Sequence, residues 1–148
     1  MPQAATPKKH LAIVTCMDAR VDVLGAFGLA VNDVHLLRNA GAVITDDVLR
    51  SLVLSQRILD TRSVRVVGHT DCALRNYSDA ELADLLIRET GTAPTFEFGT
   101  FHDLDEHVRT SVERIRICPW LPYVDDVTGW VYDVADHTIS ALETNPAA

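Results

Sequence analysis

Two short segments of the chain carry metal-binding side chains directly after apolar runs. Cys16 follows the apolar run at residues 11–14, and His69 and Cys72 follow a second run at residues 64–67. Together these segments offer two thiols and one imidazole. A catalytic zinc ion is typically held by three protein ligands and keeps a fourth position open, whereas a structural zinc ion is closed by four. The inventory therefore predicts an open zinc site.

A charged pair lies beside the first of these ligands, because Asp18 and Arg20 follow Cys16 within four residues. As a solvated surface pair they would contribute little to stability. As a functional pair, Arg20 would keep Asp18 ionised, since a nearby cation lowers the pKa of a carboxyl group. Asp18 could then accept a hydrogen bond from zinc-bound water or occupy the open position itself. We predict the functional pair because it adjoins a predicted ligand.

The remaining histidines and cysteine carry weaker signals. An isolated buried cysteine is more often a small core residue than a ligand, and we expect this of Cys118. Four further histidines have no assignable role, and we expect them at the surface: His35, His102, His107 and His137.

Strands and helices alternate along the chain and must position these side chains. Apolar runs predict strands at residues 11–15, 33–38, 64–67 and 129–134. Helical periodicity predicts helices at residues 45–59, 78–91 and 103–117, with a short helix or turn at residues 21–29. This alternation predicts a single-domain α/β fold with a central, mostly parallel β-sheet flanked by helices. Ligands bind beyond the carboxyl ends of such strands. If the first and third strands are neighbours, the three metal ligands converge.

The ends of the chain and of its helices carry local signals. Thr45 can cap the first long helix, and Ser78 with Glu81 has the spacing of a capping box. We expect residues 1–10 to form a loose N-terminal tail and the residues after 134 to form a short polar tail.

Composition excludes several classes of partner. The chain has 148 residues and a formal net charge of −8, which argues against nucleic acid and anionic membranes. No apolar run approaches the roughly 20 residues that span a bilayer, and residues 1–10 lack the apolar segment of a secretory signal. Three cysteines make a disulfide framework improbable and fit reduced thiols in the cytoplasm.

The motif Cys16-x-Asp18-x-Arg20 with His69-x-x-Cys72 resembles the zinc signature of the β-class carbonic anhydrases, and in particular their small bacterial and archaeal members. The similarity continues through RNAG at residues 38–41, TDDVLRSL at residues 45–52 and GWVYDV at residues 129–134. It covers residues 11 to about 136, nearly the whole chain.

The resemblance implies a catalytic domain at residues 11–148 that uses Zn²⁺ to hydrate CO₂ reversibly to bicarbonate. It also implies an obligate homodimer, which in some relatives pairs into a homotetramer. Carried onto this sequence, the zinc ligands are Cys16, His69 and Cys72, and the catalytic dyad is Asp18 and Arg20. We further predict that Asn39 and Gly41 bind substrate. Two departures from the family pattern are Ala73, where glycine is common, and a short N-terminal extension.

The implied mechanism uses zinc-bound hydroxide as the nucleophile. In the carbonic anhydrase with three histidine ligands, zinc lowers the pKa of its bound water to about 7. Two thiolates leave this site with less positive charge, so we expect a water pKa no lower than that, with Asp18 and Arg20 compensating. Two alternatives remain open: hydrolysis of CS₂ or COS at the same zinc, and a structural zinc site closed by Asp18 without turnover.

Overall fold

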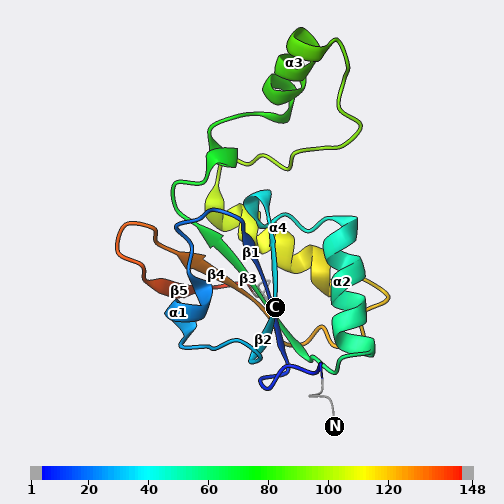
Figure 1. The fold of residues 1–148 in the computed structure, drawn as a ribbon, viewed down its shortest axis with the longest axis vertical. Helices are drawn as coiled ribbons and strands as arrows, with labels where there is room; N and C mark the ends of the chain where they lie inside the picture. The colour runs from blue at the N-terminus through cyan, green and yellow to red at the C-terminus, as the bar shows by residue number, and fades with distance from the viewer. Residues whose placement is uncertain (1–4, 145–148) are drawn as a thin grey trace.

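The computed structural model describes residues 5–144 and is built around a five-stranded sheet (Figure 1). The strands are β1 (Leu11–Cys16), β2 (Val34–Asn39), β3 (Ser63–His69), β4 (Val127–Tyr132) and β5 (Ile139–Leu142). Their order across the sheet is β2-β1-β3-β4-β5, and every pair is parallel except β4 with β5. The predicted α/β fold with a mostly parallel sheet is confirmed.

Within residues 5–144, four α-helices connect or flank the strands. They are α1 (Val23–Phe27), α2 (Asp46–Arg57), α3 (Asp79–Thr90) and α4 (Leu104–Arg116), and two short 3₁₀ turns lie at η1 (Ala40–Ala42) and η2 (Ala73–Arg75). The predicted caps are present: the Thr45 side chain accepts from the Val48 amide, and Ser78 accepts from the Glu81 amide. Each cap satisfies a backbone donor that the first turn of a helix leaves unpaired.

The sheet has a hydrophobic core on each face. All six residues of β1 are buried, as expected for a central strand with both faces covered. On one face β1 and β3 pack against α2 and α4, and on the other a smaller cluster involves α1. α4 packs closely on β3 and β4 at two glycines, Gly68 and Gly129. A Cβ atom on either glycine would lie 2.7 Å from a methyl group of Val108. Because these two glycines have no side chain, α4 can lie close to the sheet, including β3, the strand that carries His69.

The chain after β4 is more structured than the sequence predicts. Instead of a polar tail, residues 139–142 form β5, which pairs antiparallel with β4 at the edge of the sheet. A turn at residues 134–136, followed by His137 with φ of 61°, reverses the chain between the two strands. The prediction was wrong because a strand of four residues, ISAL, has too little apolar periodicity to stand out. Residues 145–148 lie outside the described part.

Residues 8 and 9 of the expected N-terminal tail are attached to the body of the protein. The amides of Lys8 and Lys9 donate to the carbonyls of Asn32 and Asp33, each at 2.9 Å. Residues 1–4 lie outside the described part. Within residues 5–144, no helix has the length and apolar character needed to cross a membrane.

α3 stands apart from the sheet at the far end of the molecule (Figure 1). None of its twelve residues is buried. Its base is tied to the returning loop by Asp79, whose carboxylate accepts from the amides of Phe98 and Thr100 and from the Thr100 hydroxyl. We refer to residues 77–101 as the α3 arm.

Candidate metal centre

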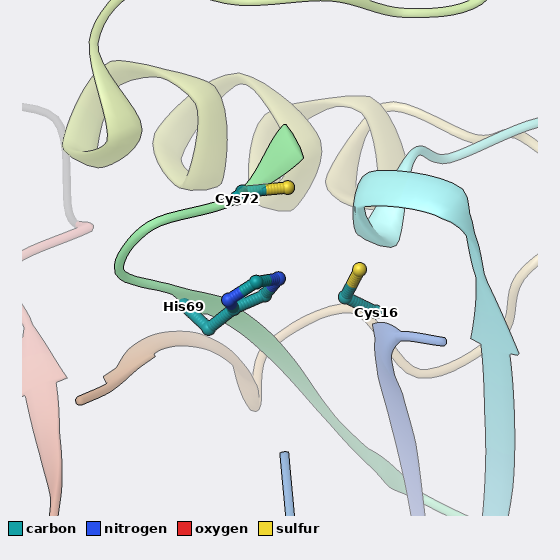
Figure 2. Close-up of side chains that lie close together, drawn as sticks. All are labelled: Cys16, His69 and Cys72. Atoms are coloured by element: carbon teal, nitrogen blue, oxygen red, sulfur yellow. The ribbon is translucent and has the colours of Figure 1, made fainter. Parts of the chain in front are cut away.

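The three predicted ligands meet beyond the carboxyl ends of two neighbouring strands. β1 and β3 pair in parallel, with Thr15 opposite Val67, so Cys16 and His69 end adjacent strands. Cys72 returns over them from the following turn. Their ligand atoms all lie within 4.8 Å of one another and all three residues are buried. Figure 2 shows the imidazole and both sulfur atoms directed into the same space.

The His69 ring has the tautomer of a metal ligand. Its Nδ1 lies 2.7 Å from the Thr70 carbonyl, which can only accept, so Nδ1 carries the proton. A neutral ring then has a lone pair on Nε2. That atom is buried and has no hydrogen-bond partner among the described residues. An unpaired buried polar atom is costly, and a cation between His69 Nε2 and the two thiols would satisfy it.

The pKa values of the two thiols are shifted in opposite directions by their mutual contact. A hydrogen bond from Cys72 lowers the pKa of Cys16 far below its usual value, and the hydrogen bond from the Gly41 amide to Cys16 Sγ, 3.3 Å long, lowers it further. The same contact with Cys16, together with burial, raises the pKa of Cys72. Because thiolate is the form that ligates metal, a bound cation would displace the remaining proton. Two sulfurs and one nitrogen suit zinc and similar soft or borderline ions.

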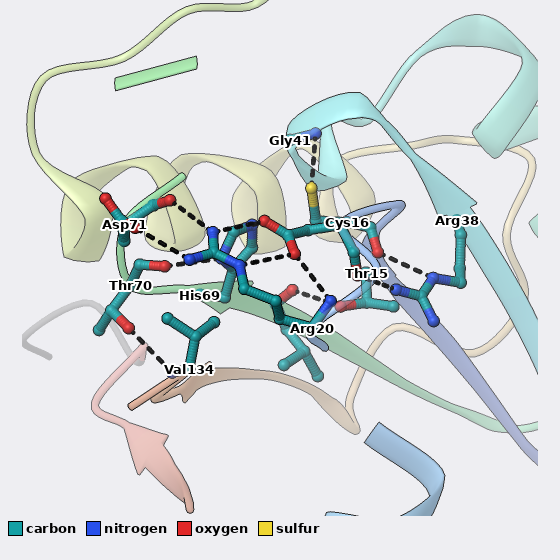
Figure 3. A network of polar contacts seen from close by, with 11 residues as sticks. Thr15, Cys16, Arg20, Arg38, Gly41, His69, Thr70, Asp71 and Val134 are labelled. Atoms are coloured by element: carbon teal, nitrogen blue, oxygen red, sulfur yellow. Dashed lines mark hydrogen bonds and ion pairs between the residues drawn. The ribbon is translucent and has the colours of Figure 1, made fainter. Parts of the chain in front are cut away.

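Asp18 and Arg20 form a bidentate ion pair beside the ligands, in the polar network in which Figure 3 labels Arg20, Cys16 and His69. Arg20 Nε and Nη2 donate to the two Asp18 oxygens at 3.0 and 2.7 Å, and the Arg20 amide donates to Oδ1 at 2.9 Å. The Arg20 guanidinium holds the pKa of Asp18 well below its usual range. Asp18 Oδ2 lies 3.8 Å from His69 Nε2. The expected pair therefore adjoins the ligands in space as well as in sequence.

Two further residues, not identified from the sequence, hold the same loops. Asp71 accepts from Arg20 Nη1 at 2.9 Å, so Arg20 links the loop after β1 to the loop after β3. Arg38 donates to the carbonyls of Cys16 and Asp18 at 2.8 and 2.7 Å. The position of Asp71 between the two ligands of the second motif places it near the site, but the sequence carries no signal for its partner.

Asn39 and Gly41 shape the turn that lies over Cys16. Both polar groups of the Asn39 amide bond to the backbone of Val43, at 2.8 and 3.0 Å. Gly41 has φ of 83°, a left-handed conformation that favours glycine. Its amide faces the Cys16 sulfur. The substrate-binding role expected of these two residues stays a prediction.

Comparison with known proteins identifies the family. A family model described as "Carbonic anhydrase" matches residues 11–90. "Beta-carbonic anhydrase 1" of Mycobacterium tuberculosis is 42% identical over 134 residues, which cover 90% of this chain and 82% of that protein. The chain belongs to the β-class carbonic anhydrases.

Other β-class carbonic anhydrases and one related hydrolase share the fold or the sequence. The crystal structure of a carbonic anhydrase from Streptococcus mutans superposes with a TM-score of 0.91 at 38% identity, covering 97% of this chain and 87% of that one. A "Carbon disulfide hydrolase" from an Acidianus strain is 32% identical over 158 residues, covering 88% of this chain and 76% of that protein. Membership of the family therefore does not by itself select the substrate.

The β-class carbonic anhydrase family is metal-dependent, and in this chain the cysteine–histidine–cysteine group supplies the ligands such a metal needs. Ala73, which replaces a common glycine, is exposed and does not have a positive φ. Its backbone therefore does not demand glycine. Cys118 is buried in the core cluster, as expected.

Proposed function

We propose that this chain holds one Zn²⁺ through Cys16, His69 and Cys72 and catalyses the reversible hydration of CO₂ to bicarbonate. The proposal rests on His69 Nε2, which is buried, has no hydrogen-bond partner within residues 5–144 and has two thiols within 4.8 Å, beside a carboxylate held by Arg20. When bound, zinc supplies a Lewis acid that lowers the pKa of water to near neutrality.

Asp18 is the proposed hydrogen-bond acceptor for the reacting water. Its pKa is depressed, so it is ionised across the neutral range and cannot itself donate. Arg20 engages both oxygens and fixes the plane of the carboxylate. Asp18 Oδ2, 3.8 Å from His69 Nε2, remains able to accept a further hydrogen bond on the side of the ligands. Orientation of this acceptor is the contribution we assign to the dyad.

A cleft beside His69 gives small molecules a route to the ligands. It has a volume of about 410 Å³ and is also lined by Arg75 and His102. CO₂ fits easily in this volume. Three carboxylates, those of Asp71, Asp103 and Asp105, line the cleft together with Arg75, so its charge does not by itself favour an anion. A larger cavity of about 630 Å³, lined by residues 5–8, 31, 32, 34 and 35, includes none of the proposed ligands and plays no part in the proposal.

Hydrolysis of CS₂ or COS at the same zinc is the second candidate. The similarity to the Acidianus carbon disulfide hydrolase favours it. The ligand set would be the same, so access to the site has to decide between the substrates. Purified protein should be assayed in parallel for CO₂ hydration and CS₂ hydrolysis, and we expect the CO₂ reaction to dominate.

A structural zinc site closed by Asp18 is the third candidate. In such a site, binding of the Asp18 carboxylate to zinc would compete with its bidentate ion pair to Arg20, which engages both oxygens. Zinc retained at every pH without hydration of either substrate would support this candidate.

The test of the metal assignment compares two cysteines. Cys16→Ser should lose stoichiometric zinc and CO₂ hydration, because a hydroxyl is a poor substitute for a thiolate. Cys118→Ser is the matched control, since Cys118 is equally buried but lies in the core cluster, and it should keep both. Elemental analysis and stopped-flow hydration provide the two measurements. Full zinc content in Cys16→Ser would refute the ligand assignment.

We further propose a homodimer, able to pair into a homotetramer, with a cytoplasmic location. The exposed apolar residues of the α3 arm support self-association. The three cysteines are free and buried, which suits a reducing compartment.

A further inference from the structure

His107 on α4 reaches the turn that lies over the metal centre. Its Nε2 is 2.8 Å from the carbonyl oxygen of Gly41. A carbonyl can only accept, so Nε2 carries the proton and donates. The ring is stacked on Phe101, with centroids 4.0 Å apart and planes 8° from parallel. The stacking and the hydrogen bond together hold the imidazole in one orientation.

Gly41 connects this histidine to a proposed metal ligand. Its amide donates to Cys16 Sγ at 3.3 Å, in a buried contact. The amide and the carbonyl of Gly41 lie in successive peptide planes, and the φ and ψ of Gly41, 83° and 8°, set the angle between them. Fixing the carbonyl therefore also fixes the direction of the amide.

The turn needs such support because its backbone is unfavourable by itself. Gly41 and Ala42 both have a positive φ, of 83° and 53°, and a non-glycine residue in that region is strained. Asn39 clamps the two ends of the turn through Val43. His107 holds its middle.

We propose that His107 is a positioning residue for the Cys16 thiolate: by binding the Gly41 carbonyl, it aims the Gly41 amide at Cys16 Sγ. The inference rests on the proposed role of Cys16 as a metal ligand. Hydrogen bonds to a ligating atom typically tune metal affinity and activity by 10- to 100-fold. Burial lowers the pKa of His107, so the ring is neutral at neutral pH and keeps a single N–H donor for this contact.

The test compares variants with and without the donor. His107→Phe keeps a flat ring against Phe101 but cannot donate, and its zinc affinity, measured by competition with a chelator, should fall about tenfold. His107→Gln retains a donor near the same position and should bind zinc almost as tightly as the wild type. The absorption of the Co²⁺-substituted proteins should change in His107→Phe and not in His107→Gln, because it reports the cobalt–thiolate bond directly.

Val112→Ala is the matched control. Val112 is buried on the same helix and packs in the core without reaching Gly41, so its truncation destabilises the fold without touching the turn. It should leave zinc affinity and the cobalt spectrum unchanged. If His107→Phe does not fold, His107→Met supplies a second variant that lacks the donor.

Three results would overturn the inference. Wild-type zinc affinity in the variants that lack the donor would show that the Gly41 contact is irrelevant to Cys16. Equal losses in His107→Phe, His107→Gln and Val112→Ala would show that His107 acts only through stability. Absence of zinc binding by the wild-type protein would refute the metal assignment itself, and this inference with it.

Discussion

Arg20 is the residue on which the charge balance of the site depends. Its guanidinium lies between the carboxylates of Asp18 and Asp71, at 2.7 and 2.9 Å. Without it, two negative groups would adjoin a ligand set that already contains two thiols. The Asp18 carboxylate raises the pKa of Arg20 further above its usual value, and Asp71 adds to the effect. Arg20 therefore remains charged at every pH at which the protein is folded.

Arg20→Ala should keep its zinc and lose most of its CO₂ hydration. The pKa of Asp18 would rise toward its ordinary value of about 3.9, so Asp18 would stay ionised at neutral pH. The loss of activity would then come from the position of the carboxylate and not from its charge. Asp18, no longer held by Arg20, would compete with water for the open metal position. Hydroxide becomes scarcer as pH falls, so residual activity should shift to higher pH. We expect a loss of about 10- to 100-fold, measured by stopped-flow hydration across pH on zinc-replete protein.

Two further variants control this prediction. Arg20→Lys should rescue activity only in part, since lysine keeps the charge but loses the planar fork. Arg62→Ala removes a comparable exposed ion pair, with Asp60 at 3.1 Å, and should leave CO₂ hydration unchanged. Near wild-type CO₂ hydration by Arg20→Ala at neutral pH would show that Asp18 and Arg20 are only a surface ion pair without a role in the reaction.

The metal ligands and dyad that the sequence predicts lie in two short segments of the chain. Cys16, Asp18 and Arg20 lie within five positions, and so do His69 and Cys72. His107 was expected at the surface because its partner, Gly41, lies 66 residues away. A contact of that kind depends on how α4 crosses the sheet, which no local pattern encodes.

At the scale of elements, apolar runs and caps were sufficient for most of the fold. β1 was predicted because a strand buried on both faces has to be apolar, and β3 was predicted from a run that Arg65 interrupts; this half-buried arginine lies over the rings of Phe27 and Trp130. β5 was missed because an edge strand of four residues needs little apolar character. The Ser78 cap of α3 was also predicted from the sequence. The sequence did not indicate, however, that the apolar stripe of this helix would pack against no core.

The base of the α3 arm is closed by the Asp79 carboxylate. Asp79 accepts from Thr100 Oγ1 at 2.6 Å and from the amides of Thr100 and Phe98 at 2.9 and 2.8 Å. The hydrogen bonds from Thr100 lower its pKa. A carboxyl with a depressed pKa stabilises the fold above its unfolded pKa, about 3.9. The stability that Asp79 contributes is lost as pH falls through its lower pKa in the folded protein. At neutral pH, therefore, Asp79 should remain bonded to the loop at Phe98 and Thr100.

Asp79→Ala should loosen the loop that closes the arm. The amides of Phe98 and Thr100 lose their acceptor, so they should exchange with solvent about fivefold faster, as expected for the loss of roughly 1 kcal/mol of local stability. Hydrogen exchange measured by NMR gives the rates residue by residue. Asp84→Ala, on the exposed surface of α3, is the control. Unchanged exchange of these amides in Asp79→Ala would show that other contacts hold the loop at Phe98 and Thr100.

At the scale of the whole molecule, the α3 arm has apolar surface without a core. Leu85, Ile87 and Phe96 are 38%, 44% and 64% exposed. A helix of twelve residues is marginally stable in water by itself, and α3 buries no residue against the rest of the chain. A surface of this kind is typical of a protein–protein interface. Among possible partners, a second copy of the chain is the one always present.

We therefore expect a homodimer whose contacts include the α3 arm. Leu85→Glu should weaken it, because a charge would have to be buried against apolar surface, and CO₂ hydration should fall as dimers dissociate. Val31→Glu, at an exposed apolar position outside the arm, is the matched control and should leave the dimer intact. Because each chain carries a formal net charge of −8, added salt should strengthen association by screening the repulsion between copies. Analytical ultracentrifugation across salt and protein concentration measures both effects. A wild-type monomer with full activity at micromolar concentration would contradict the expectation, and the apolar surface of the arm would then need a different partner.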